Sequence, residues 1–154
     1  MPDQPLPTSR PKPKVFIDAD VLFAGSAAPS EHGASLVVLR MAEITLLEAY
    51  ASQQVVVEVE RNLGAKLPQT LEAFRMILRR CLQIVPDPSP ADLHAHAGLA
   101  DASDLPILVA ALKTGCPWLV SFNTRHYRPG HPDVIVLPPG VFLLRVRDLL
   151  ARLG

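Results

Sequence analysis

The chain has 154 residues, of which 49% are apolar, and its 15 basic and 15 acidic residues give a formal net charge of +0. These values fit one globular domain, and they exclude a disordered chain and a protein with a strong overall basic field. No apolar run reaches the roughly 18 residues of a membrane span, and no signal-peptide pattern is present. The two cysteines, Cys81 and Cys116, lack zinc-site spacing, so a cytoplasmic protein with reduced thiols is expected.

The first half of the chain begins with a proline-rich, polar segment and then alternates between apolar runs and helical patterns. Residues 1–13 are predicted to be a flexible tail before a domain over 14–154. Residues 14–18 are predicted to form a strand, followed by a short helix over 21–25. The next helix is expected to begin at a Ser30 cap and to end near Glu43.

A second strand is predicted over 44–50, followed by a helix that Ser52 caps and that ends near Gly64. An amphipathic helix over 68–80 and a brief strand over 83–85 come next. Three further helices are expected: one over 91–99, one that begins at Ser103 or Asp104 and ends at Gly115, and one over 141–153. Two further strands are expected over 118–121 and 134–137. Short apolar strands that alternate with helices predict an α/β domain, with a mostly parallel sheet of about five strands between two helical layers.

Carboxylate and amide side chains follow the ends of the predicted strands or begin the helices beside them. In open α/β sheets, ligands bind beyond the carboxyl ends of the strands. Carboxylates that gather there repel one another unless a cation neutralises them. Oxygen ligands without His or Cys favour Mg²⁺ or Mn²⁺ over zinc. The residues of this set are Asp18, Asp20, Glu58, Asp101, Asp104, Asn123 and Thr124.

Four segments occur together in a characteristic order: KVFIDADVLFAG, SQQVVVEVERNL, SDLPILVAALKTGCPWLVS and FNTRHY. In order and spacing they resemble the PIN-domain nuclease family, over about residues 14–145. The resemblance implies a three-layer α/β/α PIN-like fold. It also implies that Asp18, Glu58 and Asp104 are the three principal metal-binding acids, with Mg²⁺ or Mn²⁺ as the cofactor.

The fourth catalytic position of the family falls on Asn123, where the family often has Asp, so this chain departs from the pattern. Asp20 falls where the family often has Asn or Thr, and it is expected to support the site. Asp101 lies one helical turn before Asp104, outside the matched segment, and is also given a supporting role.

Glu58 has a rival in Glu60, because helical periodicity places the two on opposite flanks of the apolar stripe. The distance from the capping Ser52 favours Glu58. Asn62 and Lys66 follow Glu58 at steps of four residues and form one polar stripe with it. This stripe is either a solvated face or a path for substrate phosphate. Arg125 after Asn123 is a further candidate for phosphate contact.

The resemblance implies a metal-dependent endoribonuclease that hydrolyses phosphodiester bonds and leaves a 5′-phosphate. A toxin of the VapC-like type is implied, with an RNA substrate, an antitoxin partner and a homodimeric state. The first alternative is an impaired PIN fold that serves as an RNA-binding or scaffold protein, which Asn123 keeps open. The second is a small-molecule phosphohydrolase or a response-regulator-like acidic cluster, although the acceptor Asp and late Lys of a receiver domain are not evident.

Overall fold

A computed structural model describes residues 12–27 and 33–152. Its sheet has five strands in the order β3-β2-β1-β4-β5, and every neighbouring pair is parallel. The strands are β1 Lys14–Ile17, β2 Glu48–Ser52, β3 Leu82–Val85, β4 Trp118–Val120 and β5 Ile135–Leu137. The predicted α/β class and parallel sheet are confirmed.

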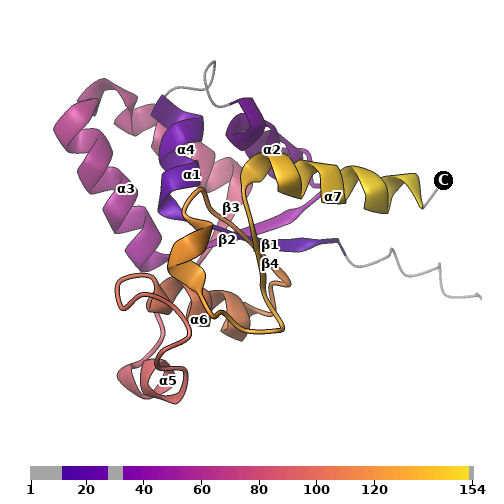
Figure 1. The fold of residues 1–154 in the computed structure, drawn as a ribbon. Coiled ribbons are helices and arrows are strands. Elements are labelled where there is room, and N and C mark those ends of the chain that lie inside the picture. The colour runs from indigo at the N-terminus through magenta and orange to yellow at the C-terminus, as the bar shows by residue number, and fades with distance from the viewer. Residues whose placement is uncertain (1–11, 28–32, 153–154) are drawn as a thin grey trace, which may run out of the picture.

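Seven α-helices and two 3₁₀ turns connect the strands within the described residues. They are α1 Ala19–Ala27, α2 Gly33–Glu43, α3 Gln53–Lys66, η1 Pro68–Thr70, α4 Leu71–Cys81, α5 Pro90–Ala95, α6 Leu105–Thr114, η2 Thr124–Tyr127 and α7 Pro139–Ala151. In Figure 1, α1, α2, α4 and α7 lie above the sheet and α6 lies below it, with α5 further out. The sheet is therefore the middle layer of three.

The core forms where β1 runs through the centre of the sheet. Val15, Phe16 and Ile17 have no exposed surface, because both faces of this strand are covered by helices. Phe74 of α4 and Leu108 of α6 are equally buried and belong to the same core cluster. Burial of such side chains stabilises the fold by roughly 1.5–3 kcal/mol each. This rigid centre fixes the carboxyl end of β1.

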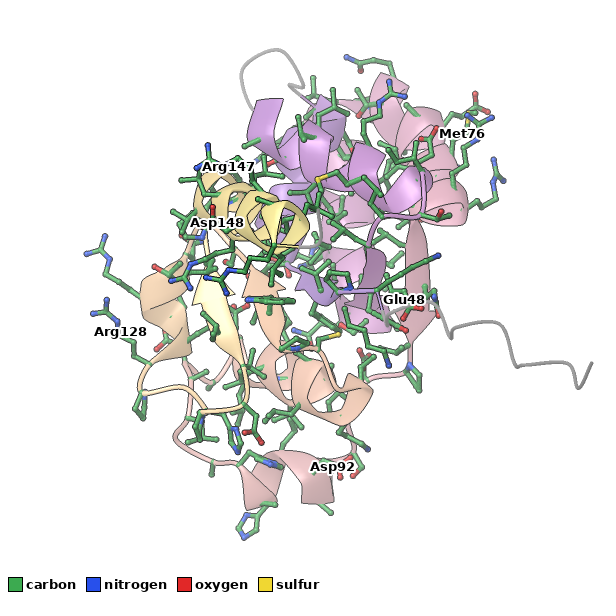
Figure 2. All side chains as sticks on the ribbon, turned by 90° about the vertical axis from the view of Figure 1, so that its right-hand side faces the viewer. Glu48, Met76, Asp92, Arg128, Arg147 and Asp148 are labelled. Atoms are coloured by element: carbon green, nitrogen blue, oxygen red, sulfur yellow. The ribbon has the colours of Figure 1, made fainter. Side chains whose placement is uncertain are left out.

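The carboxyl ends of the strands lie at one edge of the sheet. In Figure 1, β1 enters from the right, and its end points toward the side on which α3 lies. Figure 2 looks at the opposite edge, where Glu48 begins β2, while Arg128, Arg147 and Asp148 lie at the periphery of the molecule. Among the described residues, no helix combines the length and the hydropathy that a membrane-spanning segment requires.

Several predicted elements differ from the structure by one or two residues at their ends, and two differ by more. The predicted strand over 44–50 is wrong in its first half, since β2 begins at Glu48. Helix α2 instead ends in a left-handed turn at Thr45, with the N–H of Leu46 bonded to the carbonyl of Met41 at 2.9 Å. The predicted helix over 91–99 ends at Ala95, before Gly98 with its positive φ of 86°.

Other predictions of local structure are confirmed or lie outside the described residues. The Ser52 hydroxyl accepts the N–H of Val55 and caps α3, and Gly115 ends α6 at φ 74°. Helix α3 runs past Gly64 to Lys66. Ser30 and residues 1–11 of the tail predicted over 1–13 lie outside the described residues.

Thr45 has a φ of 65° although it is β-branched, so its backbone conformation is strained. We expect Thr45→Gly to raise the free energy of unfolding by about 1 kcal/mol, because glycine adopts this conformation without a steric penalty. Gly115→Ala, at φ 74° with no atom near the added Cβ, should lower it by about 1 kcal/mol. Urea unfolding of both variants tests this, and equal shifts in one direction would contradict it.

Candidate active site

Asp18 follows β1 directly and is buried, with 6% of its surface exposed. Its Oδ1 accepts the N–H of Ala19 at 2.7 Å. Its Oδ2 accepts the hydroxyl of Tyr127 at 2.6 Å and that of Ser121 at 2.8 Å. Three donors therefore hold this carboxylate in place at the carboxyl end of the central strand.

Ser121 and Tyr127 are parts of the site that sequence reasoning did not single out. Burial, and then the adjacent Asp18 carboxylate, raise the pKa of Tyr127 well above its usual value. Its hydroxyl therefore remains protonated and donates to Asp18 at ordinary pH. The only sequence signals are a polar residue that closes the apolar strand β4 and the aromatic residue that ends the segment FNTRHY.

Asp104 stands at the N-cap position of α6, but its side chain makes no capping hydrogen bond. Its Oδ2 lies 3.2 Å from Nδ1 of His126 on η2. The N–H of Asp101 donates to the carbonyl of His126 at 2.8 Å, which joins the loop before α6 to η2. The side chain of Asp104 therefore does not cap α6, and its carboxylate lies beside His126 instead.

Glu58 lies half-buried on α3, six residues beyond the Ser52 cap. Burial, and then the charges of Asp18 and Asp104, raise the pKa of its carboxyl. Glu60 points elsewhere, because its carboxylate pairs with Arg75 of α4 at 3.7 Å. The structure thus places Glu58, and not Glu60, beside the other carboxylates.

Asp18 also raises the pKa of Asp104, after the larger effect of burial, while His126 opposes the shift. Asp18 is thus close enough to Glu58 and Asp104 to disfavour the charged forms of these two acids, and a cation would relieve this repulsion. Their all-oxygen donor set fits Mg²⁺ or Mn²⁺.

The potential metal-ligand atoms that lie nearest to one another belong to a group other than Asp18, Glu58 and Asp104. Within residues 12–27 and 33–152, Asp101, Asp104 and His126 bring three potential ligand atoms within 4.8 Å of one another, while the expected trio is more widely spaced. His126 was not among the expected ligands, and its place beside Asp104 adds a potential nitrogen ligand at the rim of the site.

Asp20 and Asn123 meet beside this cluster. The Asn123 amide Nδ2 donates to Oδ2 of Asp20 at 3.1 Å, so Asn123 contacts the supporting acid directly. Burial, and then the nearby Asp18 carboxylate, raise the pKa of Asp20 to about 6.

Two hollows adjoin Glu58. A cavity of about 450 Å³ is lined by Gln54, Val57, Glu58, Arg61, Asp87, Ser103 and Asp104. A smaller one of about 180 Å³ is lined by Ala19, Asp20, Phe23, Glu58, Asn62 and Lys66. The polar stripe of α3 therefore faces the site, whereas Arg125 is exposed on η2. Arg61, which sequence reasoning missed, supplies a cation beside Glu58.

A family model described as a PIN domain matches residues 14–125. The chain belongs to the PIN-domain family. PIN domains are generally nucleases, and they generally use divalent metals. The predicted family is confirmed. The acidic cluster at the carboxyl edge of its sheet offers oxygen ligands of the kind that such an ion prefers.

Two solved structures resemble this PIN domain in fold. VapBC2 from Rickettsia felis, bound to a DNA fragment from their promoter, gives a TM-score of 0.59 at 16% identity, covering 80% of this chain and 96% of that chain. PAE2754 from Pyrobaculum aerophilum gives a TM-score of 0.61 at 14% identity, and the match covers 88% of this chain and 90% of that chain. A comparison with curated proteins found no match.

Proposed function

We propose that this PIN domain is a Mg²⁺- or Mn²⁺-dependent endoribonuclease that hydrolyses phosphodiester bonds. The observation that carries the proposal is that Glu58 and Asp104, whose pKa values are raised by burial and then by the charge of Asp18, both line a cavity of about 450 Å³. Perturbed carboxyl groups that converge on a cavity mark a functional site in preference to a solvated surface.

Asp18, Glu58 and Asp104 would hold the ion. When bound, the ion lowers the pKa of a water molecule and offsets the negative charge that develops on the phosphate. Ser121 and Tyr127 keep Asp18 in one orientation, so this carboxylate need not reorganise during the reaction. Asp18 or Asp104 would accept the proton of the attacking water. No nucleophilic side chain is required.

The RNA would pass along α3, with basic side chains on both sides of Glu58. Arg61 lines the larger cavity, while Asn62 and Lys66 line the smaller one. Lys66 is held by its contact with the ring of Phe23, with Nζ 5.6 Å from the ring centroid. Arg125 on η2 would contact a more distant phosphate. Because the net charge is +0, this local arrangement must supply the affinity for phosphate.

We expect Arg61→Gln to weaken binding of a fluorescent single-stranded RNA and to lower the slope of log affinity against log salt by roughly 0.7, the value for one phosphate contact. Arg79→Gln is the matched control, since Arg79 is exposed on α4 and lines a different hollow. Fluorescence anisotropy at several salt concentrations gives both slopes. Equal slopes for the two variants would remove Arg61 from the RNA path.

We further propose that the chain is the toxin of a toxin–antitoxin pair. The likeness to VapBC2 of Rickettsia felis supports this context. The proposal includes an antitoxin partner, a homodimeric state and a cytoplasmic location. Light scattering coupled to size-exclusion chromatography tests the dimer, and a monomer at micromolar concentration would contradict it.

An impaired PIN fold that binds RNA without cutting it is the second candidate, because Asn123 adds no charge at the fourth position. Incubation of the wild-type protein with a panel of single-stranded RNAs, with Mn²⁺ or with EDTA, separates the two. Cleavage that requires Mn²⁺ and leaves 5′-phosphates supports the nuclease. RNA binding without any cleavage across the panel supports the binding module.

A further inference from the structure

Asp20 lies at the second position of α1 with one oxygen occupied and the other buried without a partner. Its Oδ2 accepts the N–H of Phe122 at 3.0 Å, the amide of Asn123 at 3.1 Å and the hydroxyl of Ser121 at 3.4 Å. Its Oδ1 is buried and has no hydrogen-bond partner within the described part of the chain. A buried carboxylate oxygen without a partner is costly, so such an atom points to an additional ligand.

The position of Asp20 indicates what that ligand is. Ser121 Oγ lies 2.8 Å from Asp18 and 3.4 Å from Asp20, so one hydroxyl joins the two carboxylates. Asp20 also lines the hollow that it shares with Glu58. An oxygen of a second acid, held beside a cluster that is already negative, suits a cation or the water of its hydration shell.

Asn123 is engaged in holding Asp20. Its Nδ2 donates to Asp20, and its N–H donates to Ser121 Oγ at 3.1 Å. An amide in this role fixes the carboxylate without adding charge to the site. Asn123 therefore acts through Asp20, as a positioning residue.

We propose that the Asp20–Asn123 pair supplies the fourth carboxylate of the metal site, and that Asp20 carries it. This inference rests on the proposed metal-dependent function. It exchanges the two roles expected from the sequence, in which Asn123 was the fourth catalytic position and Asp20 a support. The pair contributes one negative charge to the proposed metal site, and either position could carry that charge. The site therefore keeps its fourth carboxylate although residue 123 is Asn and not Asp.

Calorimetric titration of Mn²⁺ into the wild-type chain, Asp20→Asn and the exchanged pair Asp20→Asn/Asn123→Asp tests this. Asp20→Asn should weaken Mn²⁺ binding by about tenfold or more. The same variant without metal should melt roughly 2–4 °C higher, because a buried charge beside Asp18 is gone. The exchanged pair should return the Mn²⁺ affinity to within about threefold of wild type, because the acid–amide hydrogen bond persists with its ends exchanged. Glu60→Gln, which removes one charge on the far flank of α3, is the control.

Three results would overturn the proposal. Wild-type affinity in Asp20→Asn would show that Asp20 does not serve the cation. A lower melting temperature for metal-free Asp20→Asn would assign Asp20 a purely structural role. If Asp20→Asn loses Mn²⁺ affinity and the exchanged pair does not recover it, the contribution of the pair is not its negative charge. A wild-type chain that binds no Mn²⁺ would instead contradict the proposed metal-dependent function itself.

Discussion

Asp18→Asn is expected to lower Mn²⁺-dependent RNA cleavage by about 100-fold or more, which corresponds to about 3 kcal/mol of transition-state stabilisation. Asp18 is the acid that perturbs both other members of the trio, so its charge acts at the centre of the cluster. Asparagine has the same shape, and the hydroxyls of Ser121 and Tyr127 can rotate to meet an amide. The fold should therefore survive, with a melting temperature equal to or above that of the wild type.

Single-turnover cleavage of a labelled single-stranded RNA measures this effect, and circular dichroism verifies the fold. Asp148→Asn is the matched control, because Asp148 is an exposed acid on α7 whose pair with Arg147 is largely solvated. Its activity should remain within about twofold of wild type. A well-folded Asp18→Asn variant that cleaves RNA at the wild-type rate would show that the reaction occurs elsewhere.

Glu58→Gln should lose about 100-fold in activity, whereas Glu60→Gln should lose less than about twofold. The two residues stand on the same helix and carry the same charge, and only their surroundings differ. Glu58 lines both hollows beside the site and responds electrostatically to Asp18 and Asp104. Glu60 makes one partly exposed ion pair with Arg75 at 3.7 Å, which contributes little to stability.

Cleavage rates of the two glutamine variants at saturating Mn²⁺, together with their Mn²⁺ affinities, test this pair. The expected signature is a loss of rate and affinity in Glu58→Gln alone. Equal losses in both variants would point to a long-range effect of charge. A loss confined to Glu60→Gln would reverse the assignment.

Sequence reasoning predicted that the candidate residues gather at one edge of the sheet, because parallel sheets bring the carboxyl ends of their strands to one edge. Helical periodicity alone could not choose between Glu58 and Glu60, since it leaves both on the flanks of the apolar stripe, and only the distance from Ser52 favoured Glu58. The choice was made by Arg75, which comes from another helix and pairs with Glu60. Such a contact joins two helices in the folded protein, so the hydrophobic periodicity of α3 alone does not predict it.

The contacts of Asp18 show the same limit. Tyr127 lies 109 residues away in the chain, yet its hydroxyl is 2.6 Å from Asp18. The pairing of Asn123 with Asp20 is likewise long-range. Strand β2 was misplaced for a local reason, because α2 ends in a left-handed turn at Thr45, where glycine is the usual signal.

The measurement that tests the central claim most directly is calorimetric titration of Mn²⁺ into the wild-type chain, followed by incubation of the same sample with single-stranded RNA. We predict saturable binding, and RNA cleavage that EDTA abolishes and that leaves 5′-phosphate ends. Cleavage that continues undiminished in EDTA, or the absence of both Mn²⁺ binding and cleavage, would contradict the account of this acidic cluster as a metal-dependent nuclease site.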